Sequence, residues 1–115
     1  MDRPLQIVFR DIERRTFPAR LVRERAQRLE HFYSHIIGCR VVAEASHRGP
    51  KAAPQPISVA VEVEVPGRRK IMAKSDIGRH GGRGRPSGVI NRVFDSVQRQ
   101  LEELSAILRG DVKRR

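Results

Sequence analysis

The alternation of apolar and polar residues predicts four β-strands. It is clearest over 57–65, where Glu62 and Glu64 stand among the apolar residues Ile57, Val59, Val61, Val63 and Val65. Strict alternation is typical of a strand with one buried side and one solvent-facing side, and it assigns Glu62 and Glu64 to the solvent. Weaker patterns predict three further strands, which lie around Leu5, Ile7 and Phe9, over 39–45, and over 69–75.

Two stretches repeat apolar residues at the three- and four-residue spacing of an amphipathic helix. The first helix is predicted over 17–35, with Thr16 as its N-cap. The second is predicted over 87–109, with Ser87 as its N-cap and Gly110 as its stop signal. Each helix has one apolar stripe, and both stripes need the same sheet face for burial.

The order of these elements is βαβββα. It predicts an α+β fold, in which a four-stranded sheet has two helices packed on one face, as in double-stranded-RNA-binding domains. A chain of 115 residues suffices for one core, so we expect a single domain over 1–110 and a basic tail over 111–115. The expected core includes Leu29, Val59, Val61, Val63, Val97 and Leu101.

Two segments between the predicted elements are rich in residues that interrupt regular structure. Residues 46–56 contain three prolines and one glycine, and residues 78–86 are rich in glycine and arginine. Both segments offer few apolar anchors, so we expect them to be the most mobile parts of the free protein.

The charge of the chain indicates a polyanionic partner. Its 24 Lys and Arg residues outnumber 13 Asp and Glu residues, which gives a net charge of +11 and a pI of about 11.4. Arginine predominates among the cations, and its planar fork matches phosphate oxygens and stacks on bases. Structured RNA is therefore the first candidate partner.

The open face of the sheet is expected to be acidic, because Glu44, Glu62 and Glu64 point to it, and to lack aromatic residues for base stacking. The RNA-binding residues are therefore sought on the helices and on the Gly- and Arg-rich segment. They are Arg25, Arg28, Lys74, Arg79, His80, Arg83, Arg85, Arg92 and Arg99. The alternative is that these arginines pair with neighbouring glutamates on solvated helix faces, as Arg99 could with Glu102 or Glu103.

Catalytic and cofactor motifs find no support in the sequence. The glycines of 82–88 do not have the spacing or place of a dinucleotide-binding turn, and they lack the Lys-Ser/Thr ending of a P-loop. His31 and His35 are four residues apart, but no third zinc ligand accompanies them. We expect no enzyme activity, no metal, no cofactor and no small-molecule substrate.

Compartment and membrane signals are consistent with a cytoplasmic protein. Cys39 is the only cysteine, which favours a reducing compartment and a core position for its side chain. The chain has no apolar segment long enough to span a membrane and no signal-peptide pattern at its start.

The whole pattern resembles the short form of the bacterial ribosome hibernation-promoting and ribosome-associated inhibitor family. Three stretches carry the resemblance: Ile7-Val-Phe-Arg-Asp-Ile-Glu, Arg25-Ala-Gln-Arg-Leu-Glu-His-Phe-Tyr and Phe94-Asp-Ser-Val-Gln-Arg-Gln-Leu-Glu. The resemblance implies a domain that binds ribosomal RNA on the small ribosomal subunit, near the decoding centre, and inhibits translation by overlapping the messenger and transfer RNA paths. It implies RNA-facing roles for Arg25, Arg28, Arg79, His80 and Arg99.

The chain also departs from this family. The cationic stretch from Gly81 to Gly88 replaces the acidic and aromatic residues that usually follow the histidine, and Ser96 and Glu103 occupy positions that are often basic. We expect the chain to lack the additional dimerisation domain of the long forms, so that any pairing of ribosomes would need another mechanism or another protein. The free protein is expected to be a monomer. Two alternatives remain open, namely a general binder of double-stranded RNA and a protein-interaction domain.

Overall fold

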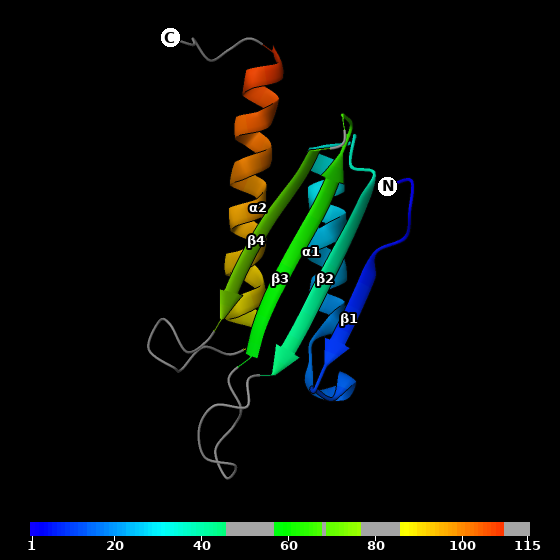
Figure 1. Cartoon of the computed structure of the whole chain (residues 1–115), viewed down its shortest axis with the longest axis vertical. Helices are drawn as coiled ribbons and strands as arrows, with labels where there is room; N and C mark the ends of the chain where they lie inside the picture. The colour runs from blue at the N-terminus through cyan, green and yellow to red at the C-terminus, as the bar shows by residue number, and fades with distance from the viewer. Residues whose placement is uncertain (46–56, 68, 77–85, 110–115) are drawn as a thin grey trace.

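The computed structural model describes residues 1–45, 57–67, 69–76 and 86–109. The strands are β1 (Gln6–Arg10), β2 (Gly38–Ala45), β3 (Ile57–Val65) and β4 (Arg69–Asp76), and the helices are α1 (Ala19–Phe32) and α2 (Pro86–Arg109). A short 3-10 helix, η1 (Arg14–Thr16), lies between β1 and α1. Figure 1 shows these elements along the chain.

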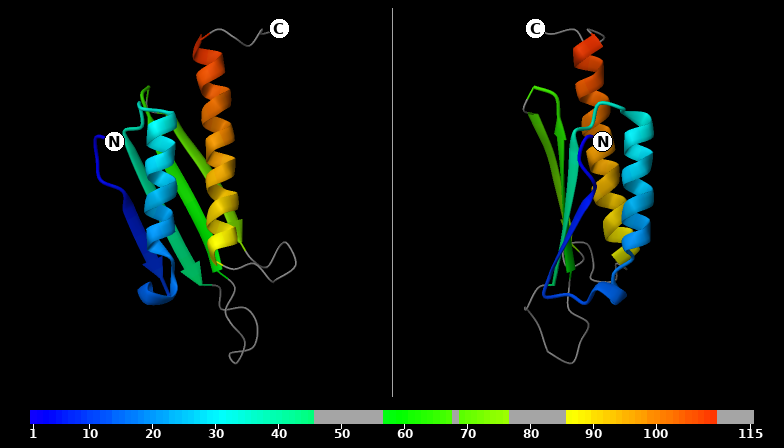
Figure 2. Two further views of the ribbon diagram at one scale, coloured as in Figure 1. Left: turned by 180° about the vertical axis from the view of Figure 1, so that it is seen from behind. Right: turned by 90° about the vertical axis from the view of Figure 1, so that its right-hand side faces the viewer.

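The four strands form one sheet in the order β1-β2-β3-β4. β1 and β2 are parallel because α1 connects them, whereas β2, β3 and β4 form an antiparallel meander. Both helices cover the same face of the sheet and leave the other face open, as the side view in Figure 2 shows. The predicted α+β fold with βαβββα order is confirmed.

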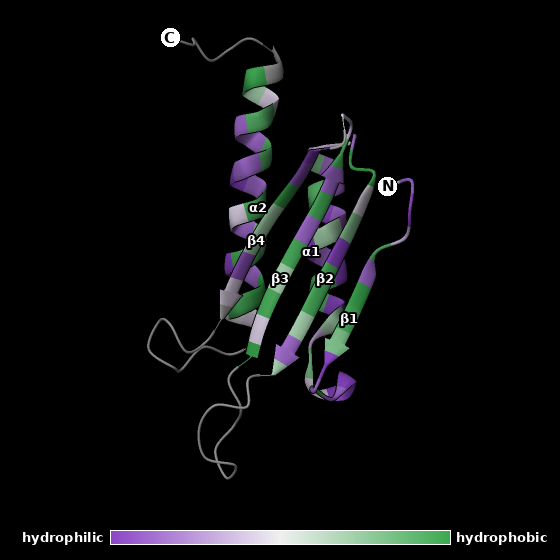
Figure 3. Ribbon diagram, in the orientation of Figure 1, coloured by the Kyte–Doolittle hydropathy of each residue, from purple (hydrophilic) through white to green (hydrophobic). Residues whose placement is uncertain are grey.

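The core lies between the helices and the covered face of the sheet. In β3 every odd-numbered residue from Ile57 to Val65 is buried, and the residues between them point to the open face, where the alternation is visible as colour bands in Figure 3. All the residues predicted to form the core are buried, namely Leu29, Val59, Val61, Val63, Val97 and Leu101. Burying each of these aliphatic side chains contributes about 1.5–3 kcal/mol, so this interface holds the layers together.

The start of α1 differs from the prediction. The helix begins at Ala19 after Pro18, and no side chain caps it. Thr16 is the last residue of η1, where its hydroxyl donates a hydrogen bond of 2.8 Å to the carbonyl of Glu13. The prediction of Thr16 as the N-cap is therefore wrong, because a threonine hydroxyl can also bind a carbonyl three residues earlier.

Several predictions fall on residues that the structure does not describe. They concern the segment 46–56, all but the last residue of 78–86, and the tail 111–115. The four candidate RNA-binding residues of the Gly- and Arg-rich segment, Arg79, His80, Arg83 and Arg85, lie there too, so their roles stay predictions.

Candidate nucleic-acid interface

Exposed arginines lie on the outer layer formed by the two helices. Arg28 on α1 and Arg92 and Arg99 on α2 are exposed, and within the described ranges none of the three forms an ion pair. The alternative pairing of Arg99 with a neighbouring glutamate is therefore not found. Arg20 is also exposed and lies 3.6 Å from Glu24 through its Nε atom, a weak surface pair. We call Arg20, Arg28, Arg92 and Arg99 the helix-layer arginines.

The position of Arg92 favours phosphate binding at the start of α2. Its Nη1 atom lies 3.6 Å from the place that a β-carbon on Gly88 would occupy, so the guanidinium folds back over the first turn. Unpaired N–H groups at a helix start attract phosphate, and a guanidinium adds charge-assisted donors. Both helices begin at the same end of the molecule, which brings Arg20 in the first turn of α1 to that end as well (Figure 2).

Arg25, in contrast, is a buried connection between the two helices. Its Nη2 donates a hydrogen bond of 2.7 Å to Asp95 Oδ1, and its Nη1 donates one of 2.8 Å to Asn91 Oδ1. The guanidinium carbon also lies 5.7 Å from the centre of the Phe94 ring. The Arg25 residue is only 6% exposed, so the prediction that it faces RNA is corrected. Its guanidinium is paired with other side chains inside the protein.

Lys74 lies on the opposite side of the molecule from the helix-layer arginines. It is exposed on β4 and pairs in register with Ala60, which places it on the open face of the sheet. The prediction that Lys74 belongs to the same cationic surface as the helices is therefore wrong. The cause is strand alternation, since Ile71 and Ala73 point to the core whereas Met72 and Lys74 point outward.

The open face of the sheet is also less acidic than predicted. Arg40, Lys70 and Lys74 lie on it beside the glutamates of β2 and β3. Lys70 pairs with Glu62 at 3.7 Å, and Arg3 pairs with Glu64. The described residues of this face include no aromatic side chain, as predicted, so it offers no platform for base stacking.

Two further exposed arginines, Arg14 and Arg23, are not among the predicted RNA-binding residues. Both line a groove between β1 and α1. Arg14 belongs to η1, an element for which the hydrophobic pattern gives no signal. Arg23 lies one helical turn after Ala19 and one helical turn before Gln27, which also line the groove. Its place on this side of α1 could therefore be predicted from the sequence.

Within the described ranges, no three His, Cys, Asp or Glu side chains lie close enough together to hold a metal ion. Neither described helix has the length and hydropathy needed to cross a membrane. Cys39 is buried as predicted, and burial raises the pKa of its thiol to about 12, so the side chain is a packing residue.

Comparison by sequence identifies no relative, because no protein-family model and no curated protein matches the chain. Comparison by structure does. A ribosomal subunit interface protein from Coxiella burnetii superimposes with a TM-score of 0.66 and 14% identity, covering 89% of this chain and 97% of that chain. The N-terminal domain of Protein Y from Thermus thermophilus superimposes with a TM-score of 0.63 and 15% identity, covering 90% of this chain and 99% of that chain.

These likenesses establish the class of fold. The chain has the α+β architecture of the two solved proteins over nearly their whole length. At such low identity the comparison concerns the fold alone. The fold implied by the resemblance to the hibernation family is thereby confirmed, and what the chain binds is argued from its surface.

Proposed function

We propose that the chain binds the small ribosomal subunit through ribosomal RNA near the decoding centre and inhibits translation by occluding the messenger and transfer RNA sites. The observation that carries the proposal is the set of exposed arginines on a fold shared with a ribosomal subunit interface protein. The sequence stretches that resemble the hibernation family support the same function. The proposal implies a cytoplasmic location and requires neither a cofactor nor a catalytic step.

The helix-layer arginines are the proposed RNA contacts among the described residues. Arg79, His80, Arg83 and Arg85 belong to the segment that enters the start of α2, and we propose that they extend the same surface. Arg25 is excluded because its guanidinium is buried against Asp95 and Asn91. Lys74 is excluded because it lies on the opposite face of the sheet.

The salt dependence of RNA binding measures the electrostatic contribution of the helix-layer arginines to affinity. Each neutralised phosphate contributes about 0.7–0.9 to the slope of log affinity against log salt, so the four helix-layer arginines together contribute about 3. Changing both Arg92 and Arg99 should lower the slope by about 1.5 and weaken binding by at least about tenfold. A slope near zero for the unmodified chain would refute an RNA interface.

The decisive experiment is co-sedimentation of the chain with isolated small and large ribosomal subunits. We expect the unmodified chain to move with the small subunit, to compete with transfer RNA there, and to inhibit a reconstituted translation system. The double variant Arg92→Glu and Arg99→Glu should fail in all three assays. Lys74→Glu with Lys70→Glu is the matched control, because it changes the charge equally on the open sheet face and should bind normally.

Two further measurements with the same variants separate the alternative functions. A general binder of double-stranded RNA would bind a naked duplex as tightly as the small subunit, and Arg92→Glu with Arg99→Glu would weaken both complexes equally. A protein-interaction domain would remain bound to its partner after RNase treatment. Either result would overturn the proposal of a specific ribosomal site.

A further inference from the structure

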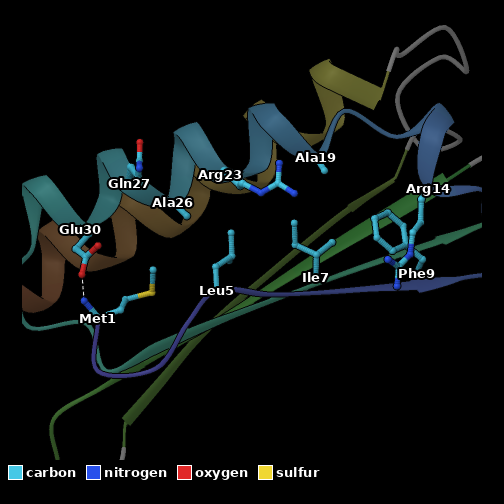
Figure 4. Close-up of a pocket in the computed structure, with 10 residues that line it drawn as sticks. All are labelled: Met1, Leu5, Ile7, Phe9, Arg14, Ala19, Arg23, Ala26, Gln27 and Glu30. Carbon is cyan, nitrogen blue, oxygen red and sulfur yellow. Dashed lines mark ion pairs between the residues drawn. The ribbon is translucent and has the colours of Figure 1, made fainter.

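A groove runs between β1 and α1 on the side of α1 that faces away from α2. It has a volume of about 570 Å³ and an apolar floor formed by Met1, Leu5, Ile7, Phe9, Ala19 and Ala26 (Figure 4). The small alanines on α1 leave this space open. Leu5, Ile7 and Phe9 point toward the helix layer but are only partly buried, so the groove offers apolar surface to a ligand.

The groove lies beside an edge of the sheet. β1 is the outermost strand, and no other described strand pairs with its second edge. At the opposite edge of the sheet, by contrast, a side chain of α2 binds the strand. Gln100 donates a hydrogen bond of 3.1 Å to the Met72 carbonyl of β4. Along an unpaired edge, alternate residues direct their backbone N–H and C=O groups outward and can form hydrogen bonds to an added strand.

The charges around the groove favour an acidic ligand. Arg14 lies over the Phe9 ring at 5.3 Å from its centre, and Arg23 is exposed on α1. Within the described ranges neither arginine forms an ion pair. Glu30, at the far end of the groove, is already paired with the amino group of Met1. The net charge of +11 disfavours a second copy of this chain at the same edge.

We propose that this groove binds an extended acidic segment of a partner protein, which adds to β1 as a fifth strand. Alternate apolar side chains of that segment would fill the groove above Ile7 and Ala26, and its carboxylates would pair with Arg14 and Arg23. The backbone edge gives affinity without sequence preference, and the groove and the two arginines give specificity. This site is separate from the helix-layer arginines, so it does not rest on the proposed ribosomal function.

The test uses the full chain without ribosomes and a fluorescent heptapeptide that alternates Glu and Val. A block peptide of the same composition keeps the charge but cannot place valines on one side of a strand. We expect fluorescence anisotropy to show at least about tenfold tighter binding of the alternating peptide. Equal affinity for the two peptides would overturn the proposal, because it would show that binding follows charge alone.

Two variants of equal charge locate the site. Arg14→Glu with Arg23→Glu should weaken the alternating peptide by about tenfold, because both rim charges are reversed. Arg20→Glu with Arg28→Glu, which changes the same net charge outside the groove, should alter affinity less than about twofold. If the two double variants behave alike, the groove is not the site.

Backbone pairing is tested separately. A version of the alternating peptide that is N-methylated at every residue keeps its side chains but cannot donate a backbone hydrogen bond from either edge, and we expect its binding to be lost. Amide resonances of β1 and α1 should shift when the unmodified peptide binds. Shifts confined to β4 would overturn the proposal. A sedimentation experiment in which the free chain forms dimers that Ile7→Glu dissociates would also overturn it, because a second copy of the chain would then occupy the groove.

Discussion

Replacement of Asp95 tests whether Arg25 is a structural connection between the helices. Asp95→Ala removes the ion pair with Arg25 Nη2 but leaves the hydrogen bond of 2.8 Å to Asn91 Oδ1. The Arg25 side chain is only 7% exposed, whereas the Asp95 side chain is 69% exposed, so water can replace only part of the lost contact. Losing one partner of a fully buried pair costs about 3–5 kcal/mol, and losing an exposed pair costs about 0–1 kcal/mol.

The free-energy cost of losing the half-buried pair between Arg25 and Asp95 should lie between these limits. We expect Asp95→Ala to lower the free energy of unfolding by about 1–2 kcal/mol, measured by urea denaturation followed by circular dichroism. Arg25→Met keeps a long unbranched side chain and removes the buried guanidinium, which lies over the Phe94 ring, together with its unpartnered Nε atom. We expect this change to cost less than Asp95→Ala, because an apolar side chain of similar volume needs no partner.

The control is Arg28→Ala, which removes an exposed arginine from the same helix and should change stability by less than about 0.5 kcal/mol. Arg25→Met should also keep its affinity for the small ribosomal subunit. The interpretation of Arg25 is wrong if Arg25→Met folds normally and fails to bind the subunit. It is also wrong if Asp95→Ala is as stable as the unmodified protein.

Two further outcomes follow from the described contacts. Because burial raises the pKa of Cys39 from 9.0 to about 12, the native thiol should resist a maleimide at neutral pH and react only in urea. The same shift means that the free energy of unfolding should decrease as the pH rises from 9.0 towards 12, where only the unfolded chain ionises its thiol. Gln100→Ala should lower stability by about 1 kcal/mol in urea denaturation, because the Met72 carbonyl loses its donor, whereas Arg99→Ala beside it should have almost no effect.

The fold could be predicted because its signals are local and repeated. The odd residues of β3 and the apolar stripes of both helices each specify a buried side without any knowledge of the partner surface. The order of elements then leaves few arrangements that bury every stripe at once. Element ends were less certain, as Thr16 shows, because one hydroxyl can serve a helix start or the preceding turn.

The candidate site was harder to predict, because it depends on how elements pack. Arg25 borders the apolar stripe of α1, so the sequence shows an arginine near a helix surface, but Asp95 is 70 residues away and only the packing of α1 on α2 pairs them. Lys74 is a different case. Its alternation with Ile71 and Ala73 already indicated a strand residue on the open face, and its basic character outweighed that signal in the prediction.

Net charge alone does not locate a polyanion interface. The fold adds which cations are already paired with carboxylates. On the open face of the sheet, Lys70 is paired with Glu62 and Arg3 with Glu64, so opposite charges largely cancel at short range. On the helix layer, Arg28, Arg92 and Arg99 have no such partners within the described ranges. A phosphate approaching Arg28, Arg92 or Arg99 therefore meets no carboxylate paired with them, whereas one approaching Lys70 or Arg3 must displace an existing carboxylate. This difference in pairing, more than the number of arginines, is the reason that we propose the helices as the RNA-binding face.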